Sequence, residues 1–275
     1  MFLLNGERRQ YVDVSDRGFQ YGDGLFETIA VFNSKPLFWR RHLARLAKGC
    51  EQLLIPPPDP ALLTAEALRI TSSADSAVLK LIVTRGSGGR GYRQPQPIVP
   101  TRLLSLHPSP NYPDEYQTDG IIARFCDQRL AISPRLAGIK HLNRLEQILA
   151  RAEWRDDAIQ EGLMLDGDGY VVEGTMSNLF FVKNGVLHTP SLVRCGIAGI
   201  VRQLVIDFAR RNEIRLLEQQ FETTSVLEAD EVFVTNSVIG IWPVKRLDQQ
   251  CFSVGSITRD IQQWYAGARI EETNL

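Results

Sequence analysis

The chain has 275 residues, of which 44% are hydrophobic and 23% charged, a composition typical of a globular protein rather than a disordered or disulfide-stapled one. Its 31 Lys and Arg and 32 Asp and Glu give a net charge of -1, which excludes an overall positive field that would attract nucleic acid or an anionic membrane. A chain of this length forms one large domain or two of moderate size, and we expect two.

Cysteine and hydropathy patterns predict a protein of a reducing compartment. The four cysteines are scattered, with no C-x-x-C pair and no histidine at metal spacing, so we expect neither disulfides nor a metal site. The longest uncharged run, 232–244, has 13 residues, well short of the roughly 20 apolar residues of a membrane helix. A charge at Glu7 interrupts the amino terminus before a signal-peptide core can form. We therefore expect a cytoplasmic location.

The first hundred residues predict a mixed unit of helices and strands. Apolar, β-prone runs bounded by turns predict strands, and apolar residues at steps of three and four predict helices. The expected strands are Met1–Leu4, Leu25–Phe32, Ala77–Thr84 and Thr101–His107. The expected helices are Trp39–Leu53, which prolines 56–58 end, and Ala61–Ile70.

A proline-rich segment marks the boundary between two domains. Three prolines in the six positions from Pro108 to Pro113 disfavour helix and deny donors to a sheet. We expect a small α+β domain over 1–107, a linker over 108–118 and a larger domain over 119–275.

The larger domain is predicted to contain short strands and two helices. Four apolar residues at helical spacing mark the first helix: Leu142, Leu145, Leu149 and Ala152. The second covers about Ile200–Arg211. The expected strands are Gly120–Cys126, Leu163–Leu165, Tyr170–Glu173, Leu179–Val182, Val186–His188 and Glu231–Thr235.

Lys140 is the candidate nucleophile among only six lysines. It falls at the predicted start of a helix, after the flexible Gly138 and between apolar neighbours, where partial desolvation would lower its pKa from about 10.4. A neutral amine can form a Schiff base with a carbonyl cofactor. A surface lysine at a helix start is the alternative, and this segment alone leaves it open.

Two segments are candidate anion sites. In Cys195–Arg202, two glycines lead into the predicted helix at Ile200, so backbone N–H groups and the positive end of the helix dipole converge on a point that suits phosphate. Residues Thr235–Ser237 place hydroxyl and amide groups at the end of a buried strand. A simple glycine turn and a strand-end cap are the respective alternatives.

Two further features carry polar chemistry. Glu173 closes an apolar strand, where a buried carboxylate needs a cationic or donor partner such as a protonated pyridine nitrogen; an exposed glutamate paired with an arginine is the alternative. The glycine-rich segment Arg85–Tyr92 is predicted to be a hairpin tip, with Arg90 and Tyr92 free to face a carboxylate. Its Arg-Gly-Gly character leaves a non-catalytic anion-binding or RNA-binding module as an alternative.

Together these segments resemble the class-IV pyridoxal-phosphate enzymes, the family of branched-chain and D-amino-acid aminotransferases and of 4-amino-4-deoxychorismate lyase. The resemblance runs from the first strand to about Val244. Its motifs, in the family's order, are Tyr21-Gly-Asp-Gly-Leu-Phe-Glu-Thr28, His42-Leu-Ala-Arg-Leu46, Lys140 before its helix, Glu173-Gly-Thr-Met-Ser-Asn-Leu-Phe180 and Gly199-Ile-Val-Arg202. Segments Thr84–Tyr92 and Leu136–Gln147 are more similar to the lyase branch.

The resemblance implies a role for each matching residue. Lys140 would be the Schiff-base lysine, and Glu173 would keep the pyridine nitrogen of pyridoxal 5'-phosphate (PLP) protonated. The implied phosphate contacts are Arg45, Ile200, Val201 and Ser237, with Val201 contributing only its backbone because many relatives have Thr there. Thr28 stands where branched-chain aminotransferases have Gly, which makes its hydroxyl a candidate catalytic group. Arg90 and Tyr92 are the candidate substrate-binding residues.

The lyase branch implies conversion of 4-amino-4-deoxychorismate to 4-aminobenzoate and pyruvate in folate biosynthesis. An aminotransferase for branched-chain or D-amino acids on the same scaffold is the alternative. The family implies a two-domain α+β fold, a distorted β-barrel in the larger domain, PLP between the domains and a homodimer. No nucleic acid, membrane or metal is expected as a partner.

Overall fold

The computed structural model describes residues 1–274, which form two compact units. The first unit contains residues 1–110, the segment 139–143 and the residues from Arg269 onward. The second contains 111–138 and 144–268. The segment that carries Lys140 therefore belongs with the amino-terminal unit, although both of its flanks belong to the other.

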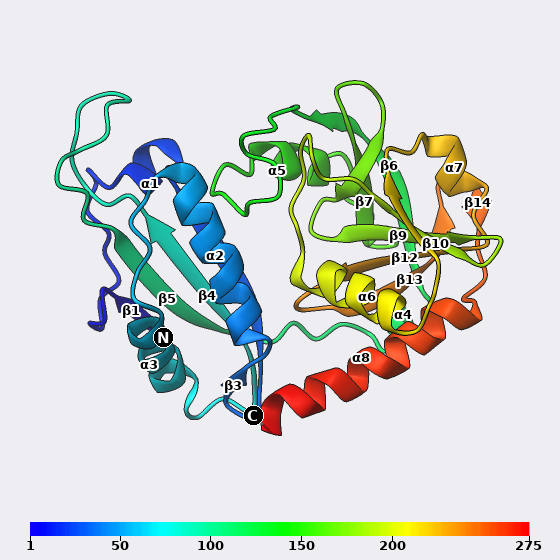
Figure 1. The fold of residues 1–275 in the computed structure, drawn as a ribbon, viewed down its shortest axis with the longest axis horizontal. Coiled ribbons are helices and arrows are strands. Elements are labelled where there is room, and N and C mark those ends of the chain that lie inside the picture. The colour runs from blue at the N-terminus through cyan, green and yellow to red at the C-terminus, as the bar shows by residue number, and fades with distance from the viewer. Residues whose placement is uncertain (275) are drawn as a thin grey trace. The chain divides into compact units, whose positions relative to one another are not determined.

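The first unit is an antiparallel five-stranded sheet with helices on one face. Its strand order is β1-β5-β4-β2-β3. The strands are β1 (Phe2–Leu4), β2 (Gly24–Phe32), β3 (Lys35–Pro36), β4 (Ser76–Thr84) and β5 (Thr101–Pro108). The helices are α1 (Arg17–Tyr21), α2 (Trp39–Leu53) and α3 (Pro60–Thr71). Figure 1 shows α2 lying along the sheet.

Strand alternation divides the side chains of β2 between the two faces of this sheet. Leu25 and Glu27 are buried beneath α2, where Gly49 of the helix leaves room for the Leu25 side chain. Phe26 and Thr28 point to the opposite face and are only partly buried. The sheet therefore has a helix-covered core face and a second face that presents Phe26 and Thr28.

Residues 139–142 extend the sheet rather than begin a helix. The backbone N–H of Phe26 donates to the carbonyl of Lys140 at 2.9 Å, and that of Leu142 donates to Gly24 at 3.0 Å. The predicted helix is thus wrong at its start, because pairing with β2 holds this segment extended. The helix α5 begins only at Leu145 and ends at Arg151.

The second unit is built around a closed six-stranded barrel. Its strands follow the order β9-β12-β13-β6-β7-β8, and β8 pairs again with β9 to close the ring. Their bounds are β6 (Ile121–Leu130), β7 (Glu161–Asp166), β8 (Val171–Gly174), β9 (Asn178–Lys183), β12 (Glu231–Asn236) and β13 (Gly240–Leu247). The strands β10 (Val186–Pro190), β11 (Leu216–Gln219) and β14 (Gln250–Cys251) lie outside the ring. The predicted α+β class and the barrel are confirmed.

Helices surround this barrel. They are α4 (Glu115–Thr118), α5, α6 (Ile200–Arg211), α7 (Thr223–Leu227) and α8 (Ser256–Asn274). Phe208 of α6 packs on Trp264 of α8 with ring centroids 4.8 Å apart, and Phe180 stacks on Phe233 between β9 and β12 at 5.1 Å. Figure 1 shows α6 beside these strands. Within 1–274 we find no helix that is both long enough and apolar enough to cross a bilayer.

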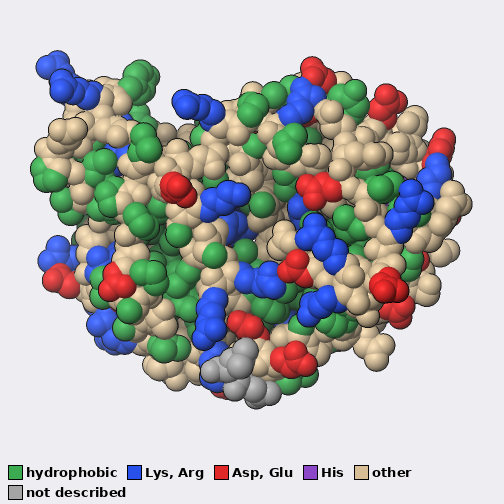
Figure 2. Space-filling view, viewed as in Figure 1, with side chains coloured by type: hydrophobic (Ala, Val, Ile, Leu, Met, Phe, Trp, Pro, Cys, Tyr) green, Lys and Arg blue, Asp and Glu red, His purple; other side chains and the backbone are tan. Residues whose placement is uncertain are grey.

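Several carboxy-terminal elements were not predicted from the sequence: β11, α7, β13, β14 and α8. The start of α8 explains one omission, because its cap comes from a distant strand. Glu231 of β12 accepts the backbone N–H of Thr258 at 2.8 Å, so the side chain that caps this helix is distant in the sequence. On the face seen in Figure 2, Lys and Arg side chains are interspersed with Asp and Glu.

Candidate active site

Lys140 is held at the edge of β2 with its ammonium over an aromatic ring. The Lys140 Nζ atom lies 4.5 Å from the centroid of Phe26. The backbone pairing of residues 140–142 with β2 fixes the start of this side chain. The charged amine of Lys140 is attracted to the face of the Phe26 ring. It therefore lies on the face of the sheet that presents Phe26.

A second ammonium approaches the same ring. Lys80 lies on β4 opposite Thr28 of β2, and its Nζ is 5.4 Å from the Phe26 centroid. Paired residues in a sheet share a face, so Lys80, Thr28 and Phe26 lie together, with Ser105 of β5 next to Lys80 in register. No acidic side chain of residues 1–274 forms an ion pair with Lys80. Lys80 was not predicted from the sequence, because strand register alone brings it to this face.

Arg45, predicted to contact phosphate, forms a buried ion pair beneath the same sheet. Its Nε donates to Glu27 Oε1 at 2.9 Å, and its Nη2 donates to Glu27 Oε2. His42 Nδ1 lies 2.6 Å from Glu27 Oε2. Burial alone would raise the pKa of Glu27, but attraction to Arg45 and then His42 outweighs it and lowers that pKa to about 2. The Glu27 partner of Arg45 was not predicted.

Arg85 anchors the glycine-rich loop instead of standing at its tip. Its guanidinium is 4% exposed and donates to both carboxylate oxygens of Asp23 at 2.8 and 2.9 Å. It also donates to the carbonyls of Leu53 and Leu54, each at 2.8 Å. These bonds use four of the five N–H donors of a buried guanidinium, so Arg85 itself is not an accessible contact for RNA.

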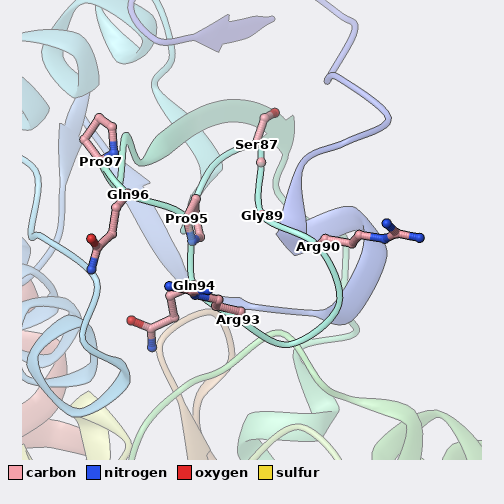
Figure 3. Close-up of a pocket in the computed structure, with 9 residues that line it drawn as sticks. Ser87, Gly89, Arg90, Arg93, Gln94, Pro95, Gln96 and Pro97 are labelled. Atoms are coloured by element: carbon pink, nitrogen blue, oxygen red, sulfur yellow. The ribbon is translucent and has the colours of Figure 1, made fainter.

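The glycine-rich segment lies in the loop of the β4–β5 hairpin, as predicted, but this loop is long, because β4 ends at Thr84 and its antiparallel partner β5 begins only at Thr101. The loop lines an open pocket of about 540 Å³, formed by residues 87–90 and 93–97. Figure 3 shows the Arg90 side chain extending away from Gln94 and Pro95. Tyr92 is 89% exposed and touches Tyr21 edge to face. Both predicted substrate contacts thus lie on an accessible loop, and their role stays a prediction.

In the second unit, Glu173 is buried at the end of β8 with a fixed orientation. Its Oε2 accepts the backbone N–H of Ile197 at 2.8 Å and the side-chain amide of Asn178 at 3.3 Å. Glu173 also attracts the guanidinium of Arg144, where burial lowers the arginine pKa and this carboxylate opposes the change. The exposed-glutamate alternative for Glu173 is wrong, because the side chain is 3% exposed.

The amino terminus of α6 lies beside the same asparagine. Gly199 is the cap of this 12-residue helix, and no side chain caps it. A Cβ on Gly199 would lie 2.0 Å from Asn178 Oδ1, so only glycine fits. The first backbone N–H groups of a helix have no partner within it, and at Ile200 and Val201 they provide donors for an anion.

Thr235 and Ser237 complete this end of the barrel. Thr235 pairs with Asn178 between β12 and β9, and Asn178 pairs with Glu173 between β9 and β8. Among the residues described, the buried Thr235 Oγ1 has no hydrogen-bond partner. Ser237 follows in a turn that Asn236 closes by accepting from Val238 at 2.8 Å. The structure thus brings a carboxylate, a helix terminus and an unsatisfied hydroxyl to one end of the barrel.

Asn178 is the central residue of this arrangement, and its role was not predicted. The sequence contained it within the motif that begins at Glu173, but only the three-strand row and the contact with Gly199 reveal what it does. Residues 1–274 contain no group of three or more His, Cys, Asp or Glu arranged to hold a metal ion.

Comparison with known proteins agrees with this arrangement. The chain is 35% identical to the aminodeoxychorismate lyase of Vibrio harveyi over 95% of this chain and 98% of that one, and 33% identical to a putative branched-chain-amino-acid aminotransferase of Methanocaldococcus jannaschii over 97% and 95%. The crystal structure of 4-amino-4-deoxychorismate lyase from Pseudomonas aeruginosa superposes with a TM-score of 0.94 at 46% identity, covering 97% of this chain and 98% of that one. The profile of the amino-transferase class IV family matches residues 24–247. This chain therefore belongs to the class IV aminotransferase family.

Proposed function

We propose that this protein is a PLP-dependent lyase that converts 4-amino-4-deoxychorismate to 4-aminobenzoate and pyruvate, a step of folate biosynthesis. The observation that carries the proposal is the placement of Lys140 over Phe26, on the sheet face that also presents Thr28 and Lys80. An amine nucleophile beside a hydroxyl and a second cation suits a substrate that carries two carboxylates. Relatives named for this lyase activity, at 35% and 46% identity, support it.

The second unit has the donors and acceptor that PLP requires. Glu173 is a buried carboxylate that can accept from a protonated pyridine nitrogen. The uncapped start of α6 and the unsatisfied Thr235 Oγ1 suit the phosphate. Val201 would contribute only its backbone N–H, and Ser237 its hydroxyl. Arg45, in the first unit, is the remaining phosphate contact that the family resemblance implies, and its guanidinium is paired with Glu27.

The residues of this chain would then perform a proton transfer and an elimination. When bound, PLP supplies an electron sink for the substrate carbon that bears nitrogen. Lys140 would hold the cofactor covalently until the substrate amine replaces it, and its neutral amine would then remove the proton from that carbon. The ether C–O bond breaks and the enolpyruvyl group takes up one proton, which we assign to Lys140 or Thr28. The products, 4-aminobenzoate and pyruvate, contain every atom of the substrate.

An aminotransferase is the second candidate, because the relative from Methanocaldococcus jannaschii is named as one. The two reactions would share Lys140 and Glu173 and differ after the proton is removed: the lyase breaks the ether C–O bond and releases pyruvate, whereas an aminotransferase exchanges the amino group. Thr28 favours the lyase, since it adds a hydroxyl on the face of Lys140.

The test begins with the purified protein and its visible absorbance, which reports lysine-bound PLP. Pyruvate release from aminodeoxychorismate is then measured against transamination of branched-chain and D-amino acids. Lys140→Ala should lose both the absorbance and turnover, whereas Lys183→Ala, which removes an exposed lysine paired with Glu228, should keep both. Pyruvate release by Lys140→Ala would overturn the assignment.

We also propose a cytoplasmic homodimer. All four cysteines are free, and Cys50, Cys126 and Cys195 are buried, as suits a reducing compartment. Light scattering during gel filtration tests the dimer: a mass near 62 kDa, twice the 31.0 kDa chain, is expected, and a single-chain mass would contradict it.

A further inference from the structure

Glu161, at the start of β7, is a buried carboxylate outside the set of residues assigned so far. Its side chain is fully buried, and within residues 1–274 it forms no ion pair with a Lys, Arg or His. Burying a charge without a counterion is unfavourable unless hydrogen bonds replace its hydration. The hydrogen-bond donors to Glu161 therefore show which segment of the chain this carboxylate holds in place.

Both oxygens of Glu161 accept bonds from one turn, residues 175–177, and Oε1 also accepts the backbone N–H of the adjacent Gly162 at 2.9 Å. Oε1 accepts the backbone N–H and the hydroxyl of Thr175 at 2.9 and 2.6 Å. Oε2 accepts the hydroxyl of Ser177 at 2.6 Å and the backbone N–H of Met176 at 3.4 Å. A Cβ on the adjacent Gly174 would lie 2.3 Å from Ser177 Oγ and 2.7 Å from Glu161 Cδ. The turn is thus packed directly on this carboxylate.

The turn joins the two strands that carry the pyridine-nitrogen site. Glu173 is in β8, just before the turn, and Asn178 begins β9, just after it. The Asn178 amide donates to Glu173 across these two strand ends, and the turn that joins them is closed by the Gly174 N–H, which donates to the Ser177 carbonyl at 2.7 Å. Glu161 therefore acts on Glu173 through the turn.

The same turn reaches the proposed phosphate contacts. The carbonyl of Met176 accepts from the Asn236 side-chain amide at 3.0 Å. The other end of that amide accepts from the backbone of Val238 and Ile239 at 2.8 and 2.9 Å, which closes the turn around Ser237. A chain of hydrogen bonds thus leads from Glu161 through Met176 and Asn236 to the residue assigned to phosphate.

We propose that Glu161 is a positioning residue that keeps both ends of the PLP site in place through the turn 175–177. Its hydrogen bonds go to Gly162 and to the turn, so we assign it a role through the turn and no contact with substrate or cofactor. The inference rests on the proposed PLP site. It holds that Glu161 fixes the position of Glu173, which would contact the pyridine nitrogen, and of Ser237, which would contact the phosphate.

The chain offers a matched control in Glu231. This carboxylate is also buried and also accepts backbone N–H groups and a threonine hydroxyl, those of Ile257 and Thr258. It caps α8 instead of the turn 175–177. Glu161→Gln and Glu231→Gln therefore remove the same kind of interaction at two places. Only Glu161 bonds to the turn 175–177, which leads to Glu173 and Ser237.

The experiment measures PLP binding by the two variants without substrate. Glu161→Gln should raise the dissociation constant for PLP about tenfold or more, as expected for loss of bonds to a charged group, and should shift the pH titration of the visible absorbance. Glu231→Gln should lower the melting temperature with both PLP properties unchanged. Equal PLP affinities in Glu161→Gln and wild type, or equal losses in the two variants, would overturn the inference.

Two further measurements keep the test decisive if Glu161→Gln folds poorly. Ser177→Ala removes a single bond to Glu161 and should weaken PLP binding in the same direction by a smaller factor. Hydrogen exchange should rise at both 175–178 and 236–239 in this variant; unchanged exchange at 236–239 would contradict the chain of bonds. Failure of wild-type protein to bind PLP would instead refute the proposed function.

Discussion

The side-chain amide of Asn178 donates to Glu173 Oε2 at 3.3 Å and to the carbonyl of Ile197 at 2.8 Å. The same oxygen of Glu173 accepts the backbone N–H of Ile197, so the three residues form a closed cycle of hydrogen bonds. The cycle connects the end of the barrel to the turn at Ile197, before α6. It also fixes the orientation of the Glu173 carboxylate.

Asn178→Ala should loosen this carboxylate. The change removes two bonds and leaves the partly buried Ile197 carbonyl without its side-chain donor, so PLP affinity should fall about tenfold. Titration of the variant with PLP checks this. Asn212→Ala, which removes an exposed amide that caps the end of α6, is the control and should bind PLP as wild type does. Wild-type affinity in Asn178→Ala would count against the cycle.

Lys80→Met should impair substrate binding more than turnover. The ammonium near Phe26 is the cation that the sheet offers to a substrate carboxylate, and a bond to a charged group contributes about 1.5–3 kcal/mol, so KM should rise about tenfold or more. The exposed Lys48 provides the control in Lys48→Met. Steady-state kinetics with aminodeoxychorismate decide the matter, and an unchanged KM would show that Lys80 does not contact the substrate.

Glu27 should make stability depend on pH in the acid range. Its pKa is lowered from 4.5 to about 2 in the folded protein, so the unfolded chain binds the proton more readily. The stabilisation is complete above pH 4.5 and is lost as the pH falls toward 2, with a total of about 3 kcal/mol. Urea unfolding across this range measures it. Glu27→Gln should be less stable at neutral pH and should lose less stability on acidification; a parallel decline in both proteins would contradict the prediction.

Two arginines of one loop should respond oppositely to substitution. Arg85→Ala leaves the carboxylate of Asp23 with Arg17 as its remaining arginine partner, so unfolding free energy should fall by about 3 kcal/mol. Arg90→Ala alters an exposed side chain and should leave stability unchanged while raising KM for the substrate. Denaturant unfolding and kinetics on both variants separate the roles, and similar losses of stability would refute the distinction.

Local patterns in the sequence were sufficient for the elements whose partners lie nearby. The spacing of apolar residues predicted α6 at Ile200–Arg211 and α2 at Trp39–Leu53 with the bounds that the structure has. The alternation in β2 likewise follows from a sheet with one covered face. These patterns carry information because a helix or strand must bury one side.

Tertiary pairing decided the segment around Lys140. Leu142, Leu145 and Leu149 have helical spacing, yet Leu142 lies in an extended segment, and Leu145 and Leu149 are 72% and 56% exposed. The edge of β2 offered the N–H of Phe26 and the carbonyl of Gly24, which pair with the carbonyl of Lys140 and the N–H of Leu142. The spacing of apolar residues within one segment gives no information about a strand edge that is distant in the sequence, so it could not predict this pairing.

The sequence by itself determined the family motifs and the identity of the chemical groups: one lysine before α5, a glutamate at the end of β8 and a glycine turn before α6. Only the tertiary structure decided which neighbours these groups have. Lys80 reaches the face of Lys140 through the register of β4 on β2, and Asn178 reaches Glu173 through β9 on β8. Strand register joins residues far apart in the chain, and burial then requires each polar group brought together to find a partner.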